Sequence, residues 1–71
     1  MTDLELQILA IEDRWYRYPG RKLQAIHKLG LTETRYYQVL NRLVDDPEAA
    51  RVAALLVHRL QRIRAARRWH A

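Results

Sequence analysis

The sequence contains no cysteine and no phenylalanine, and only two glycines and two prolines among its 71 residues. The absence of cysteine excludes a disulfide framework and a thiolate metal site. The chain also lacks a run of about 18 apolar residues, as a membrane-spanning helix requires, and its N-terminus lacks the features of a signal peptide. We therefore expect a cytoplasmic protein that uses no metal or cofactor and binds no membrane.

Positive charge dominates the chain, with a net charge of +5, but it is unevenly distributed. Residues 1–18 carry four acids and two arginines, whereas residues 19–44 carry five basic residues and a single acid, Glu33. From His58 onward there are five arginines and no acid. This asymmetry suits a polyanion such as nucleic acid, although an ordinary solvated basic surface has the same composition.

The chain is short enough to form one domain, residues 1–71, and no segment alternates as a strand does. Four helices are expected, over residues 3–18, 21–29, 33–45 and 47–67. Thr2 and Glu5 have the capping-box form, Thr32 is the N-cap of the third helix, and Gly30 ends the second in the left-handed conformation. The fourth helix is longer than a three-helix core needs, so its end should project or contact another molecule.

The apolar residues of the expected helices recur at helical spacing and predict the core. The first helix contributes Leu4, Ile8, Ile11, Trp15 and Tyr18. The third helix contributes Tyr36, Val39, Leu40, Leu43 and Val44. The fourth helix contributes Ala49, Val52, Ala53, Leu56, Leu60 and Ile63. This spacing assigns Tyr36 to the core and the adjacent Tyr37 to the outer face of the third helix.

Residues 22–42 have the form of a DNA-binding helix-turn-helix: a short helix, a tight turn at Gly30, and a second helix that begins at Thr32. The predicted fold is therefore all-α, a three-helix helix-turn-helix core followed by a long basic C-terminal helix. Ile26 stands where such motifs usually have a small alanine, so the two helices are expected slightly further apart. The alternative is an ordinary helical hairpin in a small bundle.

The outer face of the third helix carries polar side chains that suit base recognition. They are Glu33, Thr34, Arg35, Tyr37, Gln38, Asn41 and Arg42. Gln and Asn can bond adenine bidentately, Arg can do the same to guanine, and Glu can accept from cytosine. Thr and Tyr suit phosphate contacts or the thymine methyl group. The alternative is a merely solvated helix face.

Basic residues on either side of this helix are candidates for contacts with DNA phosphates. Arg21 and Lys22 begin the second helix, and Arg59 and Arg62 belong to the arginine cluster of the last one. Thr32 places the first backbone amides of the third helix toward DNA. The arginine cluster is equally consistent with a frayed helix end, where cations are favoured by the helix dipole.

The sequence argues against an enzyme. Glu12 and Asp13 have Arg14 nearby, an arrangement typical of surface ion pairs rather than of an acid–base dyad. The three histidines are widely separated and have no metal-type partner at helical spacing. No nucleophile elbow or phosphate loop is present. We therefore expect no catalytic residues.

Several segments resemble short uncharacterised actinobacterial and actinophage proteins, which suggests a phage or prophage origin. The resemblance covers most of residues 8–64 and is strongest in residues 34–41, Thr-Arg-Tyr-Tyr-Gln-Val-Leu-Asn. The helix-turn-helix segment is also similar to the DNA-reading region of sigma factors. The resemblance implies a helix-turn-helix fold and DNA binding, and brings no catalytic residues. Where these proteins often have a proline, this chain has Ala53 and Ala54, which favours a continuous fourth helix.

The expected function is that of a sequence-preferring protein that binds double-stranded DNA, a small transcriptional regulator whose recognition helix, residues 33–44, enters the major groove. The last helix offers an interface for a homodimer, which would extend the site read on DNA. The alternative is an adaptor or inhibitor that binds RNA polymerase or another host protein. Its surface would comprise Leu6, Leu9, Tyr16 and Leu55.

Overall fold

The computed structural model describes residues 1–14 and 18–70, the last four of them as backbone only. Five helices and no strand occur in this part of the chain, so the predicted all-α class is confirmed. The helices are α1 (Asp3–Asp13), α2 (Pro19–Lys28), α3 (Glu33–Val44), α4 (Pro47–Val52) and α5 (Ala54–His70). The starts of α1, α3 and α4 lie within one residue of the predicted ones, whereas α2 begins at Pro19, two residues earlier than predicted, and ends at Lys28, one residue earlier.

The N-terminus of α1 is closed by a capping box, as predicted. The Thr2 hydroxyl accepts from the Glu5 amide at 3.1 Å, and a Glu5 carboxylate oxygen accepts from the Thr2 amide at 2.9 Å. The donors on Thr2, backbone first and hydroxyl second, hold the pKa of the Glu5 carboxyl below its ordinary value. One side chain thus fixes both where α1 begins and the charge at its first turn.

The turn between α2 and α3 depends on the left-handed conformation of Gly30, which has φ = 79°. Its amide donates to the His27 carbonyl at 2.9 Å, which satisfies one of the last carbonyls of α2. The Thr32 hydroxyl then accepts from the Arg35 amide at 3.1 Å and starts α3. A residue with a Cβ atom at position 30 would be strained, so the predicted role of this glycine is confirmed.

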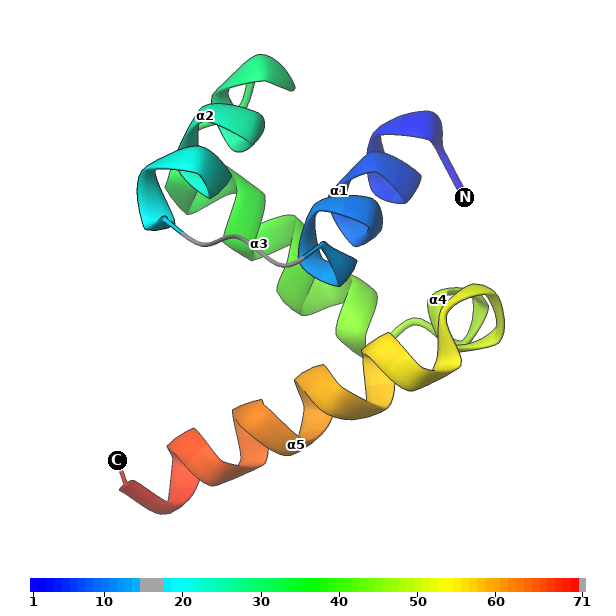
Figure 1. Cartoon of the computed structure of the whole chain (residues 1–71). Helices are drawn as coiled ribbons and strands as arrows, with labels where there is room; N and C mark the ends of the chain where they lie inside the picture. The colour runs from blue at the N-terminus through cyan, green and yellow to red at the C-terminus, as the bar shows by residue number, and fades with distance from the viewer. Residues whose placement is uncertain (15–17, 71) are drawn as a thin grey trace.

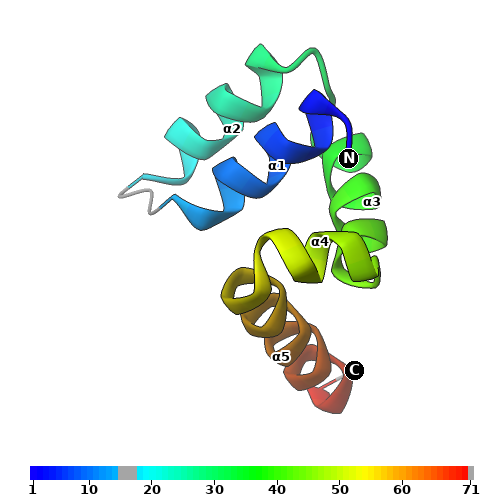
Figure 2. The ribbon, with the colours of Figure 1, turned by 90° about the vertical axis from the view of Figure 1, so that its right-hand side faces the viewer.

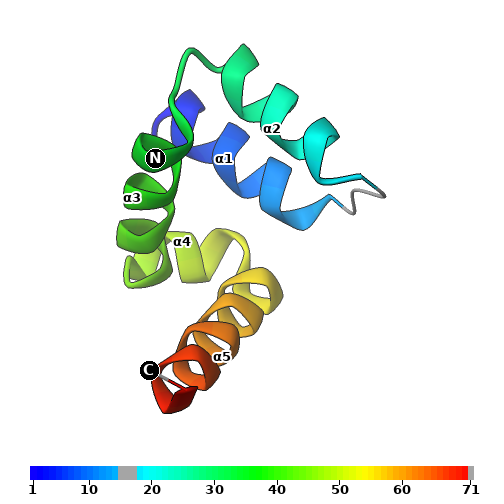
Figure 3. The ribbon, with the colours of Figure 1, turned by 90° about the vertical axis from the view of Figure 1, so that its left-hand side faces the viewer.

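The five helices form two groups joined by α3 (Figure 1). α1 and α2 lie side by side and antiparallel, and α3 runs across them at one edge of the molecule (Figures 2 and 3). The short α4 turns the chain back beneath α1, and α5 continues away from the first two helices. α3 contacts each of the other four helices, so it is the central element of the packing.

The core lies where α1, α2 and α3 meet, and continues to α4 and α5. Its buried members from the two N-terminal helices are Ile8, Leu9, Ile11 and Ile26. α3 contributes Tyr36, Val39, Leu40, Leu43 and Val44, the set predicted from its spacing. The last two helices contribute Ala49, Leu56 and Val57. Burial of these apolar surfaces is the main favourable term in the free energy of folding of such a small chain.

The first helix is shorter than predicted. α1 ends at Asp13, five residues before the predicted boundary, and Tyr18 is 58% exposed instead of belonging to the core. Tyr18 is the N-cap of α2 in extended conformation, because Pro19 disfavours helical geometry in the residue before it. Leu9, predicted to lie off the core stripe, is buried. Two further predictions, Trp15 in the core and Tyr16 in a protein-binding surface, concern residues outside the described part of the chain.

The predicted continuous helix over residues 47–67 is wrong, because the chain breaks at Ala53, with φ = −139° and ψ = 58°. The break rotates the two pieces relative to one another, so that α4 buries Ala49 and α5 buries Val57, both fully. Two residues of the apolar stripe predicted for one straight helix are therefore not buried: Val52 is 57% exposed and Ile63 is 42% exposed. Packing against α1 and α3 outweighs the helical preference of the two alanines.

Candidate nucleic-acid interface

The α3 helix lies at one side of the molecule (Figure 2), and among the described residues the neighbouring helices contact its outer face at Tyr37, Asn41 and Arg42. The structure brings all seven predicted base-reading residues to this helix and leaves each of them exposed. They are Glu33, Thr34, Arg35, Tyr37, Gln38, Asn41 and Arg42. The five buried residues of α3 occupy its opposite side. The exposed side is therefore a continuous polar surface about 18 Å long, at 1.5 Å per residue.

Three side chains in the N-terminal half of this face have no partner among the described residues. Thr34, Arg35 and Gln38 make no side-chain hydrogen bond or ion pair within the described part of the chain. Arg35 and Gln38 are three positions apart, so they are neighbours on the helix surface. Their donors and acceptors are available to a ligand without first breaking a contact.

The C-terminal end of the same face is partly engaged by neighbouring helices. The Asn41 side-chain oxygen accepts from Arg64 Nη1 of α5 at 3.1 Å. Arg64 also binds the Asp45 carboxylate through both terminal nitrogens, at 2.6 and 3.1 Å. Arg42 lies 3.7 Å from the Glu5 carboxylate of α1. A ligand at this end therefore competes with existing contacts, whereas at Arg35 it does not.

Lys22 lies beside this face but has partners inside the protein. Its ammonium is 2.5 Å from the Glu12 carboxylate and 5.4 Å from the centre of the Tyr37 ring. Burial lowers the pKa of Lys22, but the hydrogen bond and charge of Glu12, together with the interaction with Tyr37, outweigh it and raise the pKa above its ordinary value. The contacts of Lys22 thus link α2 to α1 and α3.

Glu12 is a buried partner of Lys22 and Tyr36 that the sequence analysis did not identify. Its side chain is only 8% exposed, and it accepts a hydrogen bond from the Tyr36 hydroxyl at 2.8 Å in addition to its contact with Lys22. The sequence had suggested a surface ion pair with the nearby Arg14. Partners 10 and 24 positions away on other helices give no periodic signal, so only the packing reveals them.

The remaining predicted phosphate contacts are not gathered around α3. Arg59 donates to the Glu12 carbonyl at the end of α1 at 3.2 Å. Arg62 follows Leu55 by two helical turns, and Leu55 is 87% exposed, so both lie on the side of α5 that faces away from the core. Arg21 lines a groove between α1 and α2. The Thr32 hydroxyl, by contrast, lies at the first turn of α3, as predicted.

A second surface, the Leu55 groove, lies between α1 and the break at Ala53. It has a volume of about 600 Å³, and its lining includes the exposed side chains of Leu6, Val52 and Leu55. Asp13 and Arg51 stand at its edge. The sequence had grouped Leu6 and Leu55 with Leu9, but Leu9 forms the buried floor, and Val52 joins the exposed set.

Among the described residues, no three His, Cys, Asp or Glu side chains come together as metal ligands would. None of the helices in this part of the chain is long and apolar enough to span a membrane.

The chain matches no curated protein and no solved structure. A family model does match, over residues 1–70, and it carries no assigned activity. The chain belongs to this family, described as protein of unknown function (DUF3263).

Proposed function

We propose that the protein binds double-stranded DNA as a small transcriptional regulator, with α2, the Gly30 turn and α3 acting as a helix-turn-helix. The observation that carries the proposal is the exposed pair Arg35 and Gln38, whose side chains have no partner within the described residues. The positive net charge of the chain supplies the attraction to phosphates that such binding needs. No catalytic role is proposed for any residue.

The pair on α3 fits two neighbouring base pairs. Side chains three positions apart on a helix have Cβ atoms about 5–6 Å apart, and successive base pairs are separated by about 3.4 Å. Arg bonds guanine O6 and N7, and Gln bonds adenine N6 and N7, each bidentately. The proposed reading therefore places a guanine and an adenine next to one another at the centre of the site, with Thr34 near the backbone.

A selection from random double-stranded oligonucleotides would test this function. We expect one enriched motif, and we expect Gln38→Ala to weaken binding to it by about 1–3 kcal/mol while changing non-specific binding little. Arg62→Ala is the matched control, since it removes a charge from a side of α5 that faces away from the core. Absence of an enriched motif, or equal losses for the two variants, would contradict base reading by α3.

A second candidate function is protein binding, as an adaptor or inhibitor, through the Leu55 groove. The observation that favours it is the meeting of Leu6, Val52 and Leu55, three exposed apolar side chains from three helices, in one hollow. Apolar surface of this kind is a common protein-binding feature. Leu55→Asp separates the two candidates, because it changes the groove and leaves the outer face of α3 intact.

A further inference from the structure

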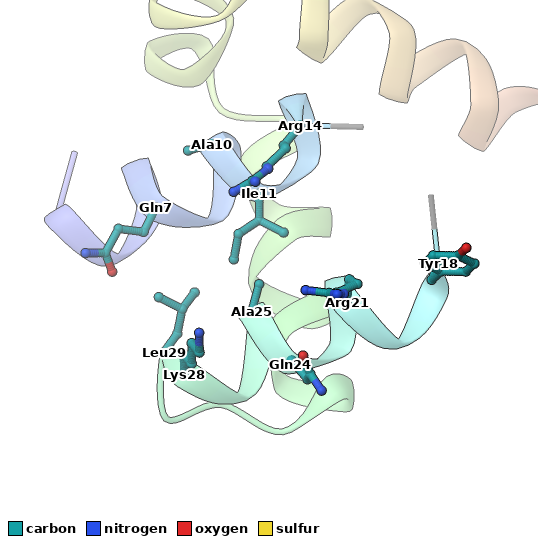
Figure 4. Close-up of a pocket in the computed structure, with 10 residues that line it drawn as sticks. All are labelled: Gln7, Ala10, Ile11, Arg14, Tyr18, Arg21, Gln24, Ala25, Lys28 and Leu29. Carbon is teal, nitrogen blue, oxygen red and sulfur yellow. The ribbon is translucent and has the colours of Figure 1, made fainter. Parts of the chain in front are cut away.

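A groove between α1 and α2, the cationic groove, opens on the side of these helices that faces away from α3 (Figure 4). It has a volume of about 810 Å³. On α1, Ile8 and Glu12 face α3. Gln7, Ala10 and Arg14 line the groove and, by the helical repeat, lie on the other side of α1. A ligand in this groove therefore occupies a different surface from DNA on α3.

The floor of the groove is apolar. Ile11 of α1 faces Ala25 and Leu29 of α2 across it, whereas Ala10 lies on the outer side of α1 and also lines the Leu55 groove (Figure 4). Ala25 has no side chain beyond Cβ, so it leaves space between the antiparallel helices that a larger residue would fill. A narrow apolar groove between two helices can bind the apolar stripe of a third, amphipathic helix.

Both rims of the groove follow a helical repeat of seven residues. The rim beside α1 comprises Gln7 and Arg14, the C-cap of that helix, and the rim on α2 comprises Arg21 and Lys28, with Gln24 between them. Seven residues are two helical turns, about 10.5 Å, so each rim has a polar group at either end of the groove. In coiled coils, flanking positions with this repeat carry the charges that select a partner.

The charge of the rims has one sign. Among the described residues, the side chains that line the groove include three cations, Arg14, Arg21 and Lys28, and no carboxylate. Since α1 and α2 are antiparallel, Arg14 and Arg21 stand at one end and Lys28 at the other (Figure 4). The Leu55 groove differs, because its lining has both an acid and a base. The cationic groove thus complements an apolar stripe bordered by negative charge on both sides.

We propose that the cationic groove is a docking site for an acidic amphipathic helix of a partner protein. The partner helix lies between α1 and α2, with its apolar residues on Ile11 and Ala25. Its Asp or Glu side chains, repeated every seven residues on each flank, meet Arg14, Arg21 and Lys28. About three turns fit, because α2 has ten residues and a length of about 15 Å. This proposal does not rest on DNA binding by α3.

A designed peptide tests the proposal on the whole chain. The probe is a fluorescent helical peptide of about 14 residues, with leucines on one stripe and glutamates on both flanks. Its controls are the same peptide with every glutamate replaced by glutamine, and a peptide of the same composition in scrambled order. We expect saturable binding of the glutamate peptide in fluorescence anisotropy, at least about tenfold weaker binding of the glutamine peptide, and none of the scrambled one.

Charge reversal locates the site. The double variant Arg21→Glu, Lys28→Glu should lose at least about tenfold in affinity for the glutamate peptide and gain affinity for a lysine-flanked version. The matched control, Arg51→Glu with Arg62→Glu, changes the net charge equally at positions outside this groove, and should bind as the wild type does. Equal losses in both double variants would mean bulk charge attraction and would overturn the proposal, as would similar binding of the scrambled peptide.

Amide chemical shifts and a DNA competitor complete the test. With the peptide bound, we expect the shifts to change in residues 7–14 and 21–29 and to stay constant at Gln38. A DNA duplex of about 20 base pairs should leave the peptide in place, because the cationic groove and the outer face of α3 lie on opposite sides. Complete mutual exclusion of peptide and DNA, or shift changes confined to the Leu55 groove, would overturn the assignment.

Discussion

The carboxylate of Glu12 accepts from the Tyr36 hydroxyl of α3 and pairs with the Lys22 ammonium of α2, so one side chain of α1 contacts both neighbouring helices. A hydrogen bond to a charged acceptor contributes more to stability than a neutral one, and it does so most where water is excluded. The fully buried ring of Tyr36 excludes water at this position. The three helices of the candidate DNA-binding unit are therefore aligned by polar contacts as well as by apolar packing.

Tyr36→Phe tests this role, since it removes only the hydroxyl. We expect the free energy of unfolding to fall by about 1.5–3 kcal/mol, measured by urea denaturation followed by circular dichroism. The control is Tyr37→Phe, on the exposed neighbouring ring, for which we expect a loss below about 1 kcal/mol. Equal losses in the two variants would show that the contact with Glu12 is not the cause.

The break between α4 and α5 is the element-scale feature that most shapes the C-terminal third. The backbone of Ala53 departs from helical geometry, and Ala54 is the first residue of α5. A proline fits the first position of a helix, because its fixed φ suits that position and the missing amide has no intrahelical acceptor there. Because of the break, position 54 can hold a proline, although the sequence predicts an uninterrupted helix there.

Ala54→Pro is therefore expected to leave the free energy of unfolding unchanged or to raise it by about 0.4–1 kcal/mol. Ala65→Pro, an exposed position in the middle of α5, should lower it by about 3 kcal/mol, because it removes a helical hydrogen bond and forces a clash. Thermal unfolding of both variants measures the difference. A large loss at position 54 would mean that residues 47–67 form one helix in solution.

The starts of α1, α3 and α4 could be predicted from the sequence and the break at Ala53 could not, for a physical reason. Thr2, Thr32 and Asp46 cap through their own side chains, and Gly30 is required by a local backbone angle, so these features can be recognised from neighbouring residues alone. The conformation of Ala53 is imposed by what α4 and α5 bury against other helices. Alanine itself favours helix, so the sequence carries no mark of the change.

The candidate site shows the same division. The spacing of α3 identified its outer face, because the helical repeat is a local property. It did not show that Arg64 engages Asn41, that Lys22 is paired, or that Arg62 faces away from the core. These facts depend on how helices far apart in the sequence pack together, for which short-range patterns carry no information.

At the scale of the whole molecule, three surfaces of different chemistry point in different directions. The outer face of α3 is polar, the groove between α1 and α2 is cationic with an apolar floor, and the Leu55 groove is apolar. The predicted homodimer through the last helix would cover Leu55, whose exposure of 87% is the largest of any large apolar side chain described.

Sedimentation over a range of concentrations measures this association. We expect the wild type to form a dimer as concentration rises, and Leu55→Asp to remain a monomer, because the charge makes burial of that position unfavourable. Circular dichroism checks that the variant keeps its helices. A wild type that stays monomeric at every concentration would contradict the dimer and leave the Leu55 groove open to a different protein.

The position of Lys22 has a consequence for how the surfaces act on one another. Its ammonium touches Glu12 of α1 and the Tyr37 ring of α3, while the preceding residue, Arg21, lines the cationic groove. Any occupant that shifts α2 relative to α1 must therefore stretch a contact that ends at the outer face of α3. Such a link is energetic coupling, and coupling between two binding events is reciprocal. Whatever factor a groove ligand imposes on DNA affinity, DNA imposes on the groove ligand in equal measure.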